Sequence, residues 1–110
     1  MYLTTQRDQP PVPNSAYGPS KNAAMWYAVR INAEDEWLNA FVIDPGWVAT
    51  DMGDAGAHLL GMEHAPTTVV DSCDGMIKVL ENTNKAKHGA KLVHYSGRVS
   101  DWRTIEWNNM

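Results

Sequence analysis

The sequence predicts an α/β fold in which two main helices cover two or three parallel strands. Residues 21–33 are apolar on most sides, as in a helix that is buried on several faces. Residues 41–43 form a short apolar run between turn-forming residues, which is typical of a strand in a parallel sheet covered by helices. Residues 66–82 repeat apolar side chains at helical spacing, and residues 92–95 indicate a last strand. The expected order is therefore strand, helix, strand, helix, strand, with right-handed crossovers.

The first predicted helix has clear boundaries. Asn14 or Ser15 is expected to cap its N-terminus, and Pro19 is tolerated because it falls in the first turn. Residues 34–36 are all acidic and bring the helix to a charged end. Acidic side chains at a helix C-terminus oppose the dipole, so we interpret them as a solvated face and not as a site. Before this helix, residues 6–14 are expected to form a Pro-rich loop, preceded by the end of a strand at residues 1–5.

The second predicted helix begins at Pro66 or Thr67 and runs to about Asn82. Its apolar stripe consists of Val69, Val70, Cys73, Met76, Ile77 and Leu80. Because Cys73 lies on that stripe, we expect a buried, inert thiol and not a nucleophile. The glycine-rich residues 53–65 that precede the helix are interpreted as a mobile connector, with room for one helical turn.

The composition is that of an ordinary globular chain, with 44% hydrophobic and 20% charged residues. A net charge of −4 gives no indication of a nucleic-acid or anionic-membrane partner. The single cysteine cannot form an internal disulfide, no apolar run approaches the ~18 residues of a membrane span, and no signal-peptide pattern opens the chain. We therefore expect a cytoplasmic protein. The four histidines lack ligand-like spacing, so no metal site is expected.

Tyr17 lies four residues before Lys21, at the start of the first predicted helix. Side chains at this spacing lie side by side on one face of a helix. An isolated phenol titrates near pH ~10, and a neighbouring ammonium favours the phenolate. The pair can therefore act as a general acid or base on a carbonyl or an alcohol. The alternative is a surface tyrosine and lysine at the mouth of a helix, without a chemical role.

A second motif follows the predicted strand, at the end where open α/β sheets bind ligands. It reads Pro-Gly-Trp-Val-Ala-Thr-Asp-Met over residues 45–52. Together with Ala-Tyr-Gly-Pro-Ser-Lys at residues 16–21, and with the helix and strand between them, this motif resembles the short-chain dehydrogenase/reductases. The resemblance runs over nearly the whole chain and is closer to the fungal ketoreductases of the norsolorinic acid ketoreductase type.

The resemblance implies the C-terminal part of a Rossmann-type doubly wound parallel sheet. Residues 1–110 would be a partial short-chain dehydrogenase/reductase domain that lacks the N-terminal Gly-rich dinucleotide-binding half, since neither Gly-x-Gly-x-x-Gly nor Gly-x-x-x-Gly-x-Gly occurs in them. The implied activity is hydride transfer between NADP (or NAD) and a small carbonyl or alcohol substrate, with an aromatic or polyketide ketone as a candidate. Because family members pack this first helix against a partner subunit, a homo-oligomer is a further hypothesis.

By the same resemblance, Tyr17 would protonate the carbonyl oxygen of the substrate as hydride arrives. Lys21 would favour the phenolate of Tyr17 and hydrogen-bond the nicotinamide ribose. Thr4 and Thr5 are the only hydroxyl residues where the family carries its substrate-orienting serine, and the family's catalytic asparagine has no counterpart. Which residue replaces the serine is left open.

The resemblance also assigns the turn after the strand to the cofactor. Pro45 and Gly46 would let the backbone approach the cofactor closely, and the Val48 backbone would meet the nicotinamide carboxamide. Thr50 would contact the carboxamide or the phosphates. On the substrate side, the resemblance places Trp47, Met52 and a lid formed by residues 53–65.

Two other interpretations stay open. The chain could be a non-catalytic remnant that pairs through its apolar helix with a full-length homologue, or a fragment without function whose first strand lacks a neighbour. The missing phosphate-binding turn discriminates between them and an enzyme, because a dinucleotide held only at its nicotinamide end loses much of its recognition. The choice between NAD and NADP cannot be read either, since the residues that contact the ribose 2′ position lie in the absent half.

Overall fold

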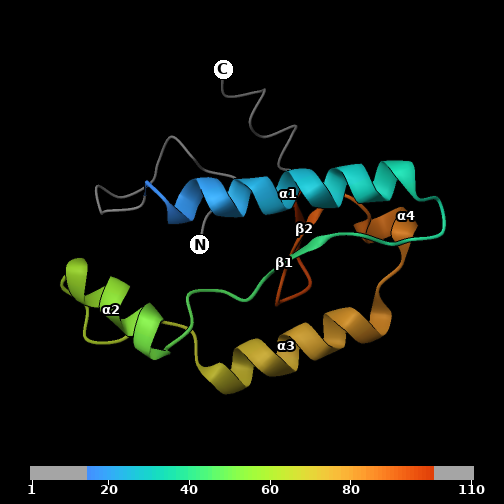
Figure 1. Cartoon of the computed structure of the whole chain (residues 1–110). Helices are drawn as coiled ribbons and strands as arrows, with labels where there is room; N and C mark the ends of the chain where they lie inside the picture. The colour runs from blue at the N-terminus through green and yellow to red at the C-terminus, as the bar shows by residue number, and fades with distance from the viewer. Residues whose placement is uncertain (1–14, 101–110) are drawn as a thin grey trace.

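The computed structural model describes residues 15–100, and Figure 1 shows their arrangement. The strand expected at residues 1–5, the loop expected at 6–14, and the candidates Asn14, Thr4 and Thr5 lie outside the described residues. The elements follow in the order α1 (Tyr17–Glu34), β1 (Val42–Asp44), α2 (Asp51–Leu59), α3 (Val69–Asn82), α4 (Lys85–His88), β2 (Leu92–His94) and β3 (Val99–Ser100).

The sheet has the order β1-β2-β3. β1 and β2 pair in parallel, with Val42 opposite Leu92 and Asp44 opposite His94, which confirms the predicted α/β fold and its parallel strands. β3 pairs with β2 in the antiparallel direction. This hairpin was not expected, and it closes through a turn in which Gly97 has a φ of 94°. The described sheet is therefore mixed.

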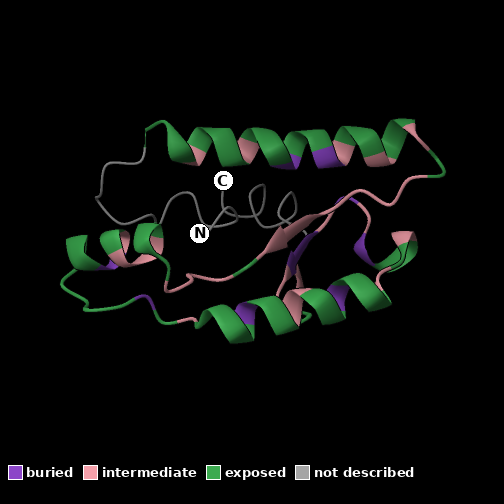
Figure 2. Cartoon of the chain, turned by 60° about the horizontal axis from the view of Figure 1, so that its bottom comes forward, coloured by how far each residue is buried: buried purple, intermediate pink, exposed green. Residues whose placement is uncertain are grey.

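Helices cover both faces of this sheet. Figures 1 and 2 place α1 on one side of the strands and α3 on the other. Met25 of α1 and Leu92 of β2 form the centre of the core, and Val42 of β1 packs against them. Val93 of β2 is completely buried.

The orientation of α3 corrects one prediction. Cys73 is exposed, and Val70, Ile77 and Leu80 of the predicted buried stripe are 66%, 53% and 60% exposed. The residues of α3 that are buried are Ser72 and Val79, and the hydroxyl of Ser72 reaches the turn after β1. On this helix, Gly75 packs closely against the backbone of Tyr95, just after β2.

The first helix differs from the prediction in two ways. Ala16 occupies the N-cap position without a side-chain hydrogen bond, so Ser15 does not cap α1. Only Met25 and Ala28 of the helix are buried, while Trp26 and Tyr27 are 58% and 66% exposed. Burial on several faces is therefore wrong within the described part of the chain, because one face alone meets the sheet. The end of the helix at Glu34 agrees with the acidic stop.

Residues 51–59 form a nine-residue helix, α2, where a connector had been predicted. The hydroxyl oxygen of Thr50 caps it by accepting a hydrogen bond from the N–H of Gly53 at 3.1 Å. Asp51 and Asp54 in the first turn complement the positive end of the helix dipole. These local contacts offset the low helix propensity of the two glycines in the segment.

Candidate active site

The structure brings Tyr17 and Lys21 together in the first turns of α1. Tyr17 is 40% exposed, and the Nζ atom of Lys21 lies over its ring, 5.1 Å from the centroid. This is the distance of a cation–π contact. The hydroxyl of Ser20 donates to the carbonyl oxygen of Tyr17 at 2.7 Å and tightens the turn that separates the two side chains. A phenol and an ammonium therefore lie side by side at an accessible helix end.

The turn after β1 is built around a glycine. Gly46 has a φ of 80°, a conformation that side-chain-bearing residues rarely adopt. A Cβ atom at Gly46 would also lie 2.7 Å from Cε1 of Tyr95 and 3.0 Å from Oγ1 of Thr67. The N–H of Gly46 donates to the carboxylate of Asp44 at 2.9 Å. Both backbone conformation and close packing thus require glycine here.

Val48 forms an isolated parallel bridge with Thr67. The bonds of this bridge run from Ala49 N–H to Thr67 O, at 2.7 Å, and from Thr67 N–H to Trp47 O, at 3.0 Å. The bridge therefore uses the peptide groups on either side of Val48 and leaves its own N–H without a hydrogen-bond acceptor among residues 15–100. Its carbonyl oxygen accepts from the Thr50 N–H at 2.8 Å and lies directly against the backbone of Gly53 at the start of α2. This edge of backbone therefore offers a ligand one donor, the N–H of Val48.

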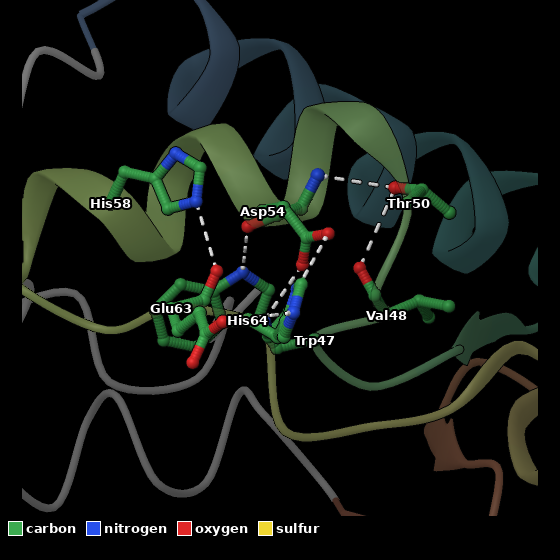
Figure 3. A network of polar contacts seen from close by, with 9 residues as sticks. Trp47, Val48, Thr50, Asp54, His58, Glu63 and His64 are labelled. Carbon is green, nitrogen blue, oxygen red and sulfur yellow. Dashed lines mark hydrogen bonds and ion pairs between the residues drawn. The ribbon is translucent and has the colours of Figure 1, made fainter.

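Trp47 and Thr50 fasten this turn to α2 (Figure 3). The indole N–H of Trp47 donates to the carbonyl oxygen of Gly53 at 2.9 Å, and the ring lies 3.8 Å from where a Cβ of Gly56 would be. The hydroxyl of Thr50 caps the helix and donates weakly to Val48 O at 3.5 Å. Both side chains that the resemblance assigned to ligands thus also have structural partners.

Residues 60–65 fold back on α2 through the network drawn in Figure 3. The carboxylate of Asp54 accepts from the backbone N–H of Ala65 at 2.9 Å and from Nδ1 of His64 at 3.3 Å. The Ala65 bond, followed by the contact with His64, holds the pKa of Asp54 below its ordinary value. Nε2 of His58 donates to the carbonyl oxygen of Glu63 at 2.9 Å. The segment that the resemblance assigned to a lid therefore consists of most of α2 and a loop that hydrogen bonds hold against this helix.

Three residues that hold the turn were not singled out from the sequence. They are Asp44, Ser72 and Tyr95. Asp44 directly precedes Pro-Gly, where an Asx-type contact to the backbone is common, so local sequence carried a signal for it. Ser72 and Tyr95 reach the turn from distant segments, and nothing in their local sequence indicates this.

The part of the chain that the structure describes contains no group of three or more His, Cys, Asp or Glu side chains that could hold a metal ion. Within the same range, no helix has the length and apolar character needed to cross a membrane.

Figures 1 and 2 agree on the relative positions of the two motifs. The N-terminal end of α1 and the segment that leads from β1 to α2 lie at the same end of the molecule. The segment follows the carboxyl end of β1, where parallel sheets bind ligands. The helix turn that carries Tyr17 and Lys21 therefore lies toward the same end of the molecule as the turn that follows β1.

Comparison with known proteins agrees with this geometry, although no protein-family model matches the chain. Norsolorinic acid ketoreductase of Aspergillus parasiticus is 43% identical over 101 residues, which cover 91% of this chain and 37% of that protein. A short-chain dehydrogenase of Pyricularia oryzae is 36% identical over 78% of this chain and 35% of its own length. The chain belongs to the short-chain dehydrogenase/reductase family. It spans little more than a third of the length of these family members.

A solved structure supports the same fold. The carbonyl reductase Sniffer of D. melanogaster superimposes with a TM-score of 0.64 at 22% sequence identity, over 91% of this chain and 38% of that one. At this level of identity the likeness concerns the fold alone. It confirms the Rossmann-type architecture that the resemblance of the two motifs implied.

Proposed function

We propose that this chain carries the general acid and the nicotinamide-facing turn of an NAD(P)-dependent ketoreductase. The observation that carries the proposal is the N–H of Val48, which has no hydrogen-bond acceptor among residues 15–100 and belongs to the segment that follows β1. A nicotinamide carboxamide offers an oxygen that can accept from that N–H. The two ketoreductases that are 43% and 41% identical to this chain support the reaction class.

Tyr17 is the group that would transfer the proton. Reduced nicotinamide, when bound, supplies hydride to the carbonyl carbon. As negative charge develops on the carbonyl oxygen, the Tyr17 hydroxyl donates its proton to that oxygen. The ammonium of Lys21, which lies beside the ring, stabilises the phenolate that remains. In the reverse direction the same phenolate accepts the proton of an alcohol.

The residues at the turn fit one end of the cofactor. Gly46 allows the turn to form against Tyr95 and Thr67, and the N–H of Val48 offers a donor. Lys21 would hydrogen-bond the nicotinamide ribose, and Thr50 would contact the carboxamide or the phosphates with the lone pair that its capping role leaves. The other end of the dinucleotide needs a glycine-rich turn, which residues 1–110 do not contain. We propose that these residues are the part of a domain that follows such a half.

A titration with NADPH that follows tryptophan fluorescence tests the proposal. Trp47 lies next to the free edge of Val48, so binding should quench it saturably, and Trp47→Phe should remove the signal. Lys21→Ala should weaken binding about tenfold, the effect of one lost charge-assisted hydrogen bond. Tyr17→Phe should bind NADPH normally but reduce no ketone. A folded chain without saturable quenching, or an active Tyr17→Phe variant, would contradict the assignment.

A second candidate function is pairing with a related full-length subunit. The exposed rings of Trp26 and Tyr27, together with Ile31 at 40% exposure, favour it because large apolar side chains on one helix commonly mark an interface. Sedimentation of the chain mixed with a full-length ketoreductase tests this candidate. Tyr27→Lys should abolish the complex without changing the circular dichroism of the chain, whereas an unchanged complex would refute the role of α1.

A further inference from the structure

The peptide group between Pro45 and Gly46 is fixed at both of its polar ends. The hydroxyl of Ser72 donates to its carbonyl oxygen, Pro45 O, at 2.7 Å. Its N–H, which belongs to Gly46, donates to the Asp44 carboxylate at 2.9 Å. Rotation of this peptide would break both bonds at once. The two contacts therefore hold one orientation of the peptide plane.

Ser72 reaches this turn because α3 packs unusually close to the backbone after β2. Gly75, three residues later on the same helix face, lies directly against the carbonyl oxygen and ring of Tyr95, where a Cβ atom has no room. Tyr95 in turn packs its ring against Gly46, and its N–H donates to Asp44 O at 2.9 Å. The absence of a side chain at Gly75 thus brings the Ser72 hydroxyl within hydrogen-bond distance of Pro45.

Burial shows that this hydroxyl is more than a surface contact. Ser72 is 1% exposed, on the face of α3 that meets the sheet, while apolar side chains of the same helix face outward. A buried hydroxyl is costly unless it is paired, and Pro45 O is the partner it has. The bond to Pro45 O therefore accounts for a buried hydroxyl on α3, although apolar side chains of the same helix are exposed.

The orientation of this peptide matters because a glycine restrains the backbone less than a residue with a Cβ atom would. A glycine with φ of 80° allows the preceding peptide to flip at little steric cost. The chain leaving Gly46 leads directly to Trp47 and Val48, whose bridge with Thr67 presents the free N–H. A flipped peptide would change the direction from which that edge is presented.

We propose that Ser72 is a positioning residue for the nicotinamide-facing turn, acting through Pro45 O. This inference rests on the proposed function for its consequence, since the turn is what the cofactor would meet. The bond itself is independent of the cofactor. Ser72 touches neither cofactor nor substrate in this assignment, and its effect passes through the peptide it holds.

The test compares Ser72→Ala with two matched variants in the full chain. Ser72→Thr keeps a hydroxyl at the position. Val79→Ala shortens the other buried side chain of α3, about two helical turns from Ser72. The first readout is hydrogen exchange of the Gly46 amide by NMR, measured against amides in the middle of α3. The second is the dissociation constant for NADPH.

Ser72→Ala should raise the exchange rate of the Gly46 amide about tenfold relative to the α3 amides and weaken NADPH binding by a similar factor, the scale of one lost hydrogen bond. Ser72→Thr should restore most of both. Val79→Ala should change exchange across α3 and leave the relative rate at Gly46 unchanged. An unchanged relative rate at Gly46 in Ser72→Ala would overturn the inference. If that rate rises but the unmodified chain binds no NADPH, the positioning contact stands and the proposed function fails.

Discussion

Gly46→Ala tests the central claim that the turn after β1 is packed against Tyr95. The substitution forces an alanine to a φ of 80°, which costs about 1–2 kcal/mol for residues with a Cβ in left-handed conformations. It also places a Cβ 2.7 Å from Cε1 of Tyr95 and 3.0 Å from Oγ1 of Thr67, and overpacking of this kind costs typically about 1–3 kcal/mol. The free energy of unfolding should therefore fall by about 2–5 kcal/mol.

Gly61→Ala is the matched control. Gly61 has a φ of 77°, nearly the same as Gly46, but no heavy atom beyond its chain neighbours lies within 4 Å of its Cβ position among residues 15–100. The strain of about 1–2 kcal/mol and the lowered entropy of the unfolded chain are common to both variants. The difference between them isolates the contact with Tyr95 and Thr67. Urea unfolding followed by circular dichroism measures both, and equal losses for Gly46→Ala and Gly61→Ala would refute the packing argument.

Three further predictions concern stability, burial and reactivity. The pKa of Asp54 is lowered in the folded chain. The ionised carboxylate therefore stabilises the fold above the ordinary pKa of 3.8, and this contribution is lost as the pH falls through the pKa of the folded state. In urea unfolding, the free energy of unfolding should fall more between pH 6 and pH 3 for the unmodified chain than for Asp54→Asn. Met25→Ala should lower the free energy of unfolding by about 2–5 kcal/mol, since Met25 is buried against Leu92, whereas Trp26→Ala, at an exposed position, should stay within about 0.5 kcal/mol in the same assay. Cys73 should react with a thiol reagent in the folded chain nearly as fast as in urea, and protection in the folded state would contradict its exposure.

The parts of the fold that were predictable from sequence depend on local patterns. The apolar run of residues 41–43 and the residues 92–95 indicated strands, and they pair in parallel as β1 and β2. The Tyr17–Lys21 contact follows from helix geometry alone, because residues four apart share a face. In each case a few neighbouring residues determine the outcome.

The errors arise where distant segments decide. Helical spacing placed Cys73 on a buried stripe, but the fit between Gly75 and Tyr95 turns a different face of α3 to the sheet. The α2 helix contains glycines that lower helix propensity, and it is stabilised by the Thr50 cap and by the bond between Asp54 and the backbone of Ala65. The fit of Gly75 and the bond between Asp54 and Ala65 join segments that periodicity does not connect. The Thr50 cap, in contrast, is a local signal that residue type carries.

The bridge between Val48 and Thr67 has a consequence for how this family can vary. It joins the two ends of the segment that contains α2, because the two bonds flanking Val48 tie the beginning of residues 49–66 to their end. A loop whose ends are held together tolerates changes of length well, since each doubling of its length adds only about 0.6 kcal/mol of closure entropy. Residues 49–66 are therefore a replaceable module. Its sequence and length can be exchanged while the strand end, the peptide between Pro45 and Gly46, and α3 keep their places.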